Sequence, residues 1–147
     1  MPAIDDAIAQ VLRDLQHQKL RIVNSRRKNG LIIYKRHHAE FAGPGAAVGG
    51  VFDQDAIAVY PVGNWSLLNP QDANEQERAY RMRRQWIKLF HQMTENPLPQ
   101  ERVQMLVDHL ETWFDAATIA QIPDEAIARL VGVLPETVTQ LRLTRDW

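Results

Sequence analysis

The sequence contains no cysteine, which excludes disulfide bridges and thiolate chemistry. It has no apolar run approaching the roughly 20 residues that a helix needs to cross a bilayer. Residues 1–10, MPAIDDAIAQ, are acidic and lack the order of basic and then apolar residues that marks a signal peptide. From these absences we expect a cytoplasmic protein without a membrane partner.

The residue patterns of common catalytic and cofactor sites are also missing. No serine lies in a nucleophile elbow, and the glycine-rich stretch 42–50 has neither the dinucleotide-binding spacing nor a Gly-Lys-Ser/Thr sequence. His37 and His38 are adjacent, and neighbouring side chains of a strand point to opposite faces, so they are poorly placed to share a metal ion. We expect no catalytic residue, no metal and no cofactor, and we do not predict an enzyme.

Charge is balanced overall but unevenly distributed. The 147 residues carry 17 Lys and Arg against 18 Asp and Glu, a formal net charge of −1. Eight basic residues and one acidic residue lie between Arg13 and Arg36, and five basic residues without an acid lie between Arg78 and Lys88. From Glu95 onward, acids outnumber bases by nine to four. This asymmetry favours an anionic partner.

The first half of the chain reads as a helix followed by short strands. Apolar residues recur at helical spacing over 3–18. Two β-branched runs, 21–23 and 31–34, flank a basic segment with the turn dipeptide Asn29-Gly30, which predicts a β-hairpin over 21–36. Its tip would carry Arg26, Arg27 and Lys28, and its second arm Lys35 and Arg36. Further strands are expected at 47–52 and 56–62, joined by a turn at Asp53–Asp55.

The second half is predicted to be helical. Apolar periodicity indicates helices at 72–94 and 100–114 and a short helix at 116–120. The first of these also carries a basic stripe of Arg78, Arg81, Arg84 and Lys88. The expected fold class is therefore α+β. An N-terminal helix and small antiparallel sheet occupy residues 1–70, and residues 71–147 form a C-terminal helical bundle, together making one compact domain.

Residues 123–142 have the spacing of two helices that meet at a tight turn. Pro123 and Asp124 suit a helix start, and Gly132 suits a left-handed helix end. Ala128, Gly132 and Val138 follow at i, i+4 and i+10, where a small residue lets the second helix cross closely. This stretch resembles the helix-turn-helix DNA-binding motifs, whose second helix enters the major groove. The resemblance covers these residues only.

The resemblance implies a small DNA-binding protein that regulates transcription, and homodimers are usual for such proteins. Because residues 115–147 hold five acids and three bases, phosphate contacts would have to come from elsewhere, and the basic hairpin is the natural supplier. Candidate contacts to double-stranded DNA are Arg26, Arg27, Lys28, Lys35, Arg36, Thr137, Thr139, Gln140, Arg142 and Arg145.

A second interpretation remains open. An αα-corner that only packs the C-terminal helices needs the same glycine and the same apolar spacing. The chain would then be a non-catalytic interaction or adaptor subunit, and its basic patches would dock an acidic partner protein.

Overall fold

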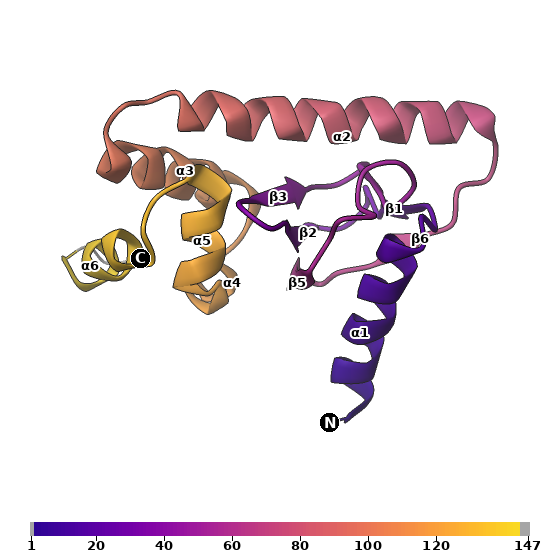
Figure 1. The fold of residues 1–147 in the computed structure, drawn as a ribbon, viewed down its shortest axis with the longest axis horizontal. Helices are drawn as coiled ribbons and strands as arrows, with labels where there is room; N and C mark the ends of the chain where they lie inside the picture. Colours follow the sequence, from indigo (N-terminus) through magenta and orange to yellow (C-terminus); the bar gives the residue numbers. More distant parts are fainter. Residues whose placement is uncertain (1, 145–147) are drawn as a thin grey trace.

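The computed structural model describes residues 2–144 and confirms the α+β class (Figure 1). Every predicted helix is present, with ends that differ by a few residues from those expected. Asp72 and Asp115 cap two of them, because each carboxylate accepts a hydrogen bond from the backbone N–H three residues later. The helices are α1 (Pro2–Gln16), α2 (Ala73–Thr94), α3 (Pro99–Trp113), α4 (Ala116–Gln121), α5 (Asp124–Val131) and α6 (Pro135–Thr144).

The strands form two antiparallel sheets of three strands each. Their orders are β4-β1-β6 and β3-β2-β5, so β1 and β2 lie at the centres of different sheets. The strands are β1 (Arg21–Val23), β2 (Asn29–Tyr34), β3 (Ala39–Ala42), β4 (Ala47–Val48), β5 (Ala58–Gly63) and β6 (Leu67–Leu68). Pro61 lies on the edge strand β5, where a residue without a backbone N–H is tolerated.

The predicted hairpin over 21–36 is therefore wrong. The segment between β1 and β2 is a loop, in which the Asn29 side chain donates hydrogen bonds to the carbonyls of Asn24 and Arg27. Gly30 is not a turn residue but part of β2, where an added Cβ would come within 2.4 Å of the Phe41 ring. The glycine is needed for this close approach between β2 and β3 and not for a reversal of the chain.

The observed hairpin is β2–β3, which turns at residues 35–38, where the Lys35 N–H donates to the His38 carbonyl at 2.8 Å. The expected pairing of strands 47–52 and 56–62 is also wrong, because β4 pairs with β1 and β5 pairs with β2. Strand β3 was not predicted. Its sequence, AEFA, is too short and mixed to give a period-two signal.

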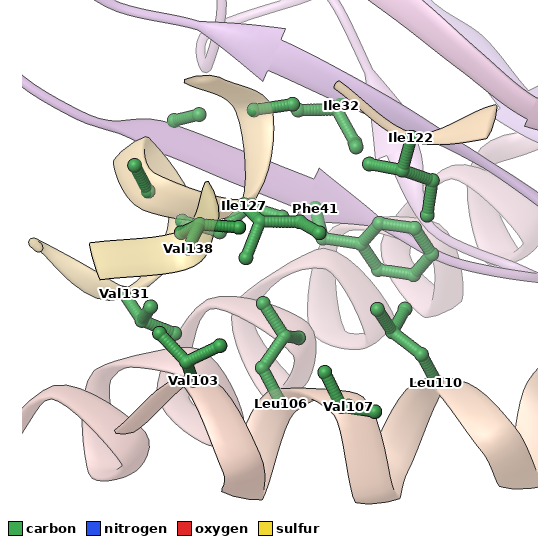
Figure 2. Close-up of a cluster of buried hydrophobic side chains, with 14 of the residues drawn as sticks. Ile32, Phe41, Val103, Leu106, Val107, Leu110, Ile122, Ile127, Val131 and Val138 are labelled. Carbon is green, nitrogen blue, oxygen red and sulfur yellow. The ribbon is translucent and has the colours of Figure 1, made fainter. Parts of the chain in front are cut away.

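A continuous apolar core joins the β3-β2-β5 sheet to the C-terminal helices (Figure 2). Ile32 and Phe41 from the sheet meet Leu106 and Leu110 from α3 and Ile127 from α5, and each of these side chains is at most 1% exposed. Helix α2 spans one side of both sheets (Figure 1). The core thus contains residues from both halves of the chain.

A buried ion cluster fixes α2 against both sheets. The Arg83 guanidinium is fully buried and makes two hydrogen bonds of 2.8 Å to the Asp53 carboxylate. It also donates to Glu40 on β3 at 2.7 Å and to the Ala47 carbonyl on β4 at 3.1 Å. The Asp53 carboxylate also accepts a hydrogen bond of 2.7 Å from the N–H of Gly49. One arginine of α2 therefore contacts both sheets and the 53–55 turn.

The cluster also includes Lys35, and this corrects the position expected for that residue. Lys35 is 3% exposed, and its ammonium lies 3.2 Å from Asp53 and 2.6 Å from Asp55 and donates to the Phe52 carbonyl at 2.7 Å. It follows the end of β2 and turns inward, because two carboxylates from the 53–55 turn lie there. It is not exposed on the arm of a hairpin.

Replacing Asp53 with asparagine should lower the free energy of unfolding by about 3–5 kcal/mol, because the buried Arg83 charge loses its carboxylate. Denaturant unfolding of purified protein measures this loss. Asp55→Asn is the matched control, since the Asp55 side chain is 72% exposed and its removal should cost about 1 kcal/mol or less. Equal losses in the two variants would contradict a central role for the Arg83–Asp53 pair.

Stability should also depend on pH. Burial raises the pKa of Asp53, but the hydrogen bonds and charge of Arg83 outweigh this, so its pKa lies below the ordinary value. A carboxylate with a lowered folded-state pKa stabilises the fold fully above its unfolded-state pKa, and this stabilisation is lost progressively as pH falls from that value through the lower folded-state pKa. We expect the unfolding free energy to decline below about pH 4. Urea unfolding at a series of pH values measures this decline, which should be shallower for Asp53→Asn than for the wild type. If the two plots of unfolding free energy against pH are parallel, Asp53 is not the group responsible.

Candidate nucleic-acid interface

The predicted corner between two helices is confirmed. Helix α5 ends at Gly132, which has left-handed dihedrals (φ 70°, ψ 44°) and whose N–H donates to the Ala128 carbonyl. Ala128 and Val138 are 1% and 0% exposed, so the small residue and the valine fill the angle between α5 and α6 as the spacing predicted. At Gly132, a residue with a Cβ would be strained.

Helix α6 has one buried side and one exposed side. Val138 and the half-buried Leu141 pack into the core cluster that includes α3 and α5. The exposed side carries Glu136, Thr139, Gln140, Leu143 and Thr144, and Thr137 is half-buried beside it. Within residues 135–144, this exposed side has no basic residue. The helix is therefore available to a partner but carries no positive charge of its own on the described surface.

Two candidate contact residues on α6 are engaged inside the protein. Arg142 donates to the carbonyls of Ile119 and Ile122 at 3.1 and 2.7 Å, and to the Asp124 carboxylate at 2.5 Å. The Thr139 hydroxyl donates to the other Asp124 oxygen at 2.6 Å. These bonds hold α6 against the turn between α4 and α5. This structural role of Arg142 and Thr139 was not predicted from the sequence. The candidate Arg145 lies outside the described residues.

The loop at residues 24–28 presents the basic triplet Arg26, Arg27 and Lys28, and all three are exposed. Its backbone is held from within, because the Arg26 N–H donates to the Asn24 side chain and the Asn29 amide donates to two loop carbonyls. Arg27 makes one long side-chain hydrogen bond, 3.4 Å to Asn64. The loop is thus a constrained element that displays three positive charges.

The side chains of Arg26 and Lys28 have no hydrogen bond or ion pair with any other residue in the range 2–144. Lys28 acts only at longer range. The pKa of Asp115 is lowered chiefly by hydrogen bonds from Thr118, and the charge of Lys28 adds to that effect. Two cations on this loop are therefore not neutralised by direct contact with the described part of the chain.

Arg36 lies at the opposite end of β2 from the basic triplet. It is exposed on the β2–β3 turn, which rests against α5, because Arg129 donates to the Lys35 carbonyl at 2.8 Å. The sequence analysis placed Arg36 and the triplet on one hairpin. The structure separates them by the length of β2, which is 6 residues.

The basic stripe of α2 is divided between two surfaces. All four residues are exposed, and Arg78 also lines a cavity of ≈ 760 Å³ together with Arg26. Arg83, which lies between these residues in sequence, points inward to the ion cluster. The role of Arg83 was not predicted, although its offset of roughly 100–160° from the four stripe residues around the helix is a signal that helical geometry offers (about 100° per residue).

No family model matches the chain, and searches of curated proteins and of solved structures find no match either. Among residues 2–144, no group of three or more His, Asp or Glu side chains is placed to hold a metal ion. No helix in the same range is long and apolar enough to cross a membrane.

Replacing Gly132 with alanine should destabilise the protein by about 1–2 kcal/mol, because alanine disfavours a left-handed conformation. Space is not the cause, since the nearest atom to an added Cβ is Arg102 Nη1 at 4.0 Å. Gly132→Asn is the matched control, because asparagine tolerates this conformation, and it should lose less stability. Thermal or urea unfolding measures both variants. A Gly132→Ala protein as stable as the wild type would show that the corner does not require the left-handed turn.

Proposed function

We propose that this protein binds double-stranded DNA as a transcriptional regulator. The observation that carries the proposal is the α5–α6 corner, which is closed by Gly132 and leaves one side of α6 exposed. A helix seated in this way can enter the major groove, which admits a single α-helix. Gln140 is exposed on that side, and a glutamine amide can make paired hydrogen bonds to adenine. The half-buried Thr137 lies beside it.

Affinity in this proposal comes mainly from the basic triplet. The exposed side of α6 carries Glu136 and no described cation, so α6 alone would be repelled by phosphates. Arg26, Arg27 and Lys28 supply three positive charges on a constrained loop, and Arg36 supplies one more from the β2–β3 turn. Phosphate contacts of this kind set affinity and register, whereas contacts to base edges set sequence preference.

Some of the residues expected from sequence are left out of the proposed contacts. Lys35 is buried in the ion cluster, and Arg142 and Thr139 hold the α4–α5 turn. Helix-turn-helix proteins usually bind as dimers, whose two recognition helices meet successive major grooves about 34 Å apart. We therefore include a homodimer in the proposal, with two copies of α6 on one site.

The first test replaces the basic triplet with glutamines (Arg26→Gln, Arg27→Gln, Lys28→Gln). Binding of the wild type to labelled genomic duplexes should weaken with added salt, with a slope in log affinity of about 0.9 per phosphate contacted. The triple variant should bind more weakly and with a shallower slope, because phosphate contacts are lost. Fluorescence anisotropy at several salt concentrations measures both quantities.

Arg13→Gln is the control for this test, since it removes an exposed charge from α1, outside the proposed contacts. It should leave both the affinity and the salt slope unchanged. Circular dichroism of each variant confirms that the fold is retained. If micromolar wild-type protein binds no duplex even at low salt, the proposal is wrong.

The second test separates base reading from phosphate binding. Gln140→Ala should reduce the preference among duplex sequences selected from a random pool, because α6 would lose a base contact worth about 1–3 kcal/mol. The salt slope should stay the same, since no phosphate contact is removed. Selection followed by sequencing measures the preference. An unchanged preference combined with retained duplex binding would place base reading elsewhere than at Gln140.

A second candidate function is docking of an acidic protein partner. It is favoured by the surface of α6 itself, where Leu143 is 81% exposed and the preceding Leu134 is 69% exposed. Exposed leucines next to an acid are more typical of a protein interface than of a surface that enters a DNA groove. In this case duplex binding would be absent. Charge reversal of Arg26, Arg27 and Lys28 would instead release a specific acidic protein that co-purifies with the chain.

A further inference from the structure

A cavity of ≈ 390 Å³ lies between the basic triplet and a group of aromatic side chains. Its volume falls in the range of about 300–1,000 Å³ that is usual for small-molecule sites. Ser25 and the triplet belong to its lining, together with Trp86 of α2 and Trp113 of α3. Phe41, Phe114, Asn29, Pro44 and Thr112 complete the lining.

The aromatic wall is held rigidly by ring-to-ring contacts. Trp113 stacks on Phe41 with a centroid distance of 5.8 Å and an angle of 9° between the planes. Trp86 meets Trp113 edge to face at 4.8 Å, and its ring lies so close to Gly43 that an added Cβ would come within 2.3 Å of it. Both tryptophans are half-buried and keep part of their surface accessible. Because the two rings are nearly perpendicular, they form an apolar corner in which a planar ring can stack on one of them and contact the other at its edge.

Trp86 has an unsatisfied polar atom. Its indole N–H is buried and has no hydrogen-bond acceptor among the described residues. Buried donors in proteins nearly always have a partner, and a tryptophan N–H is a donor only. Because this N–H lies in the ring plane, only an acceptor at the edge of the ring could satisfy it, and not an atom stacked on the ring face.

The lining of the cavity is also positively charged. No acidic side chain lines the cavity, whereas three basic residues do. Arg27 is turned toward Asn64, but Arg26 and Lys28 make no hydrogen bond or ion pair with another residue in the range 2–144. The arginine fork and the lysine ammonium are both well suited to a phosphate group, which carries more charge than a single carboxylate.

We propose that this cavity binds a nucleoside phosphate, with the base stacked on one ring of the Trp86–Trp113 corner and the phosphate on Arg26 and Lys28. Stacking on aromatic side chains together with a cationic rim is a general way to bind unpaired nucleotides. The same chemistry is present in a free mononucleotide and in an unpaired nucleotide of a single strand. This site shares the basic triplet with the proposed duplex contacts but makes no use of α6.

The test titrates the full chain with AMP, GMP, CMP and UMP, and follows intrinsic tryptophan fluorescence and the heat of binding. At least one nucleotide should give a saturable signal. Its nucleoside, without the phosphate, and inorganic phosphate, without the base, should each bind about tenfold more weakly or worse, because each lacks one half of the interaction. If no nucleotide gives saturable binding at millimolar concentration, or if adenosine binds as well as AMP, the proposal is overturned.

Three variants, Arg26→Gln, Lys28→Gln and Trp113→Phe, locate the site. Arg26→Gln should weaken nucleotide binding about tenfold, as expected for a charge-assisted hydrogen bond, and Trp113→Phe should weaken it and reduce the fluorescence change. Lys88→Gln is the control, since Lys88 is exposed on α2 and lines none of the cavities described here. If Arg26→Gln and Lys28→Gln both bind nucleotide as the wild type does, the assignment to this cavity is wrong.

A short single-stranded oligonucleotide distinguishes the two sources of ligand. Binding at least about tenfold tighter than the mononucleotide, with a steep salt dependence, identifies a single strand as the ligand. Equal or weaker binding identifies the free nucleotide. Gln140→Ala separates this proposal from duplex recognition, because it should change duplex selection and leave nucleotide binding unaltered. If the protein binds nucleotides but no duplex, the duplex proposal is wrong. If it binds a duplex but no nucleotide, the nucleotide proposal is wrong.

Discussion

The pair of hydrogen bonds between Arg83 and Asp53 is the contact on which the arrangement of this fold depends. Both side chains are fully buried, so neither charge can be solvated if the other is removed. Through Glu40 and the Ala47 carbonyl, the same guanidinium also reaches a strand of each sheet. This anchoring sets the position of α2, and α2 carries Trp86 one turn further on. The aromatic wall of the cavity is thus a consequence of the ion cluster.

Helix α3 connects the two surfaces that we propose to be functional. Near its start, Arg102 donates to the Gly132 carbonyl at 3.0 Å and so contacts the corner before α6. At its end, Trp113 lines the cavity beneath the basic triplet. Arg102 and Trp113 are about 16 Å apart along the axis of α3 at a rise of about 1.5 Å per residue, so these contacts lie well apart on the molecule. If both bind one duplex, α6 and the triplet would therefore contact the DNA backbone at different positions along it, and not the two edges of one groove.

The basic triplet connects the duplex and nucleotide proposals. Arg26 and Lys28 would serve as phosphate ligands in both, and one side chain cannot fully neutralise two phosphates at the same time. A nucleotide in the cavity would then lower the affinity for duplex DNA, and the coupling would be reciprocal. The arrangement would make the cavity a site of regulation without any change in the backbone. The coupling requires only that two ligands compete for the same charges.

The sequence by itself determined the parts of this protein that depend on neighbours a few residues away. Helical periodicity and the left-handed turn at Gly132 are local, and both were predicted. The caps at Asp72 and Asp115 are equally local, although they were not predicted. Strand pairing was not predicted correctly, because hydrogen-bond partners in a sheet are distant in sequence and a dipeptide such as Asn29-Gly30 does not reveal Phe41 above it. The roles of the charges were also decided only by tertiary structure. Nothing near Arg83 in sequence indicates that its partner carboxylate, Asp53, lies 30 residues earlier. Burial alone decides that this arginine stabilises the fold, whereas an exposed arginine would be available to a binding partner.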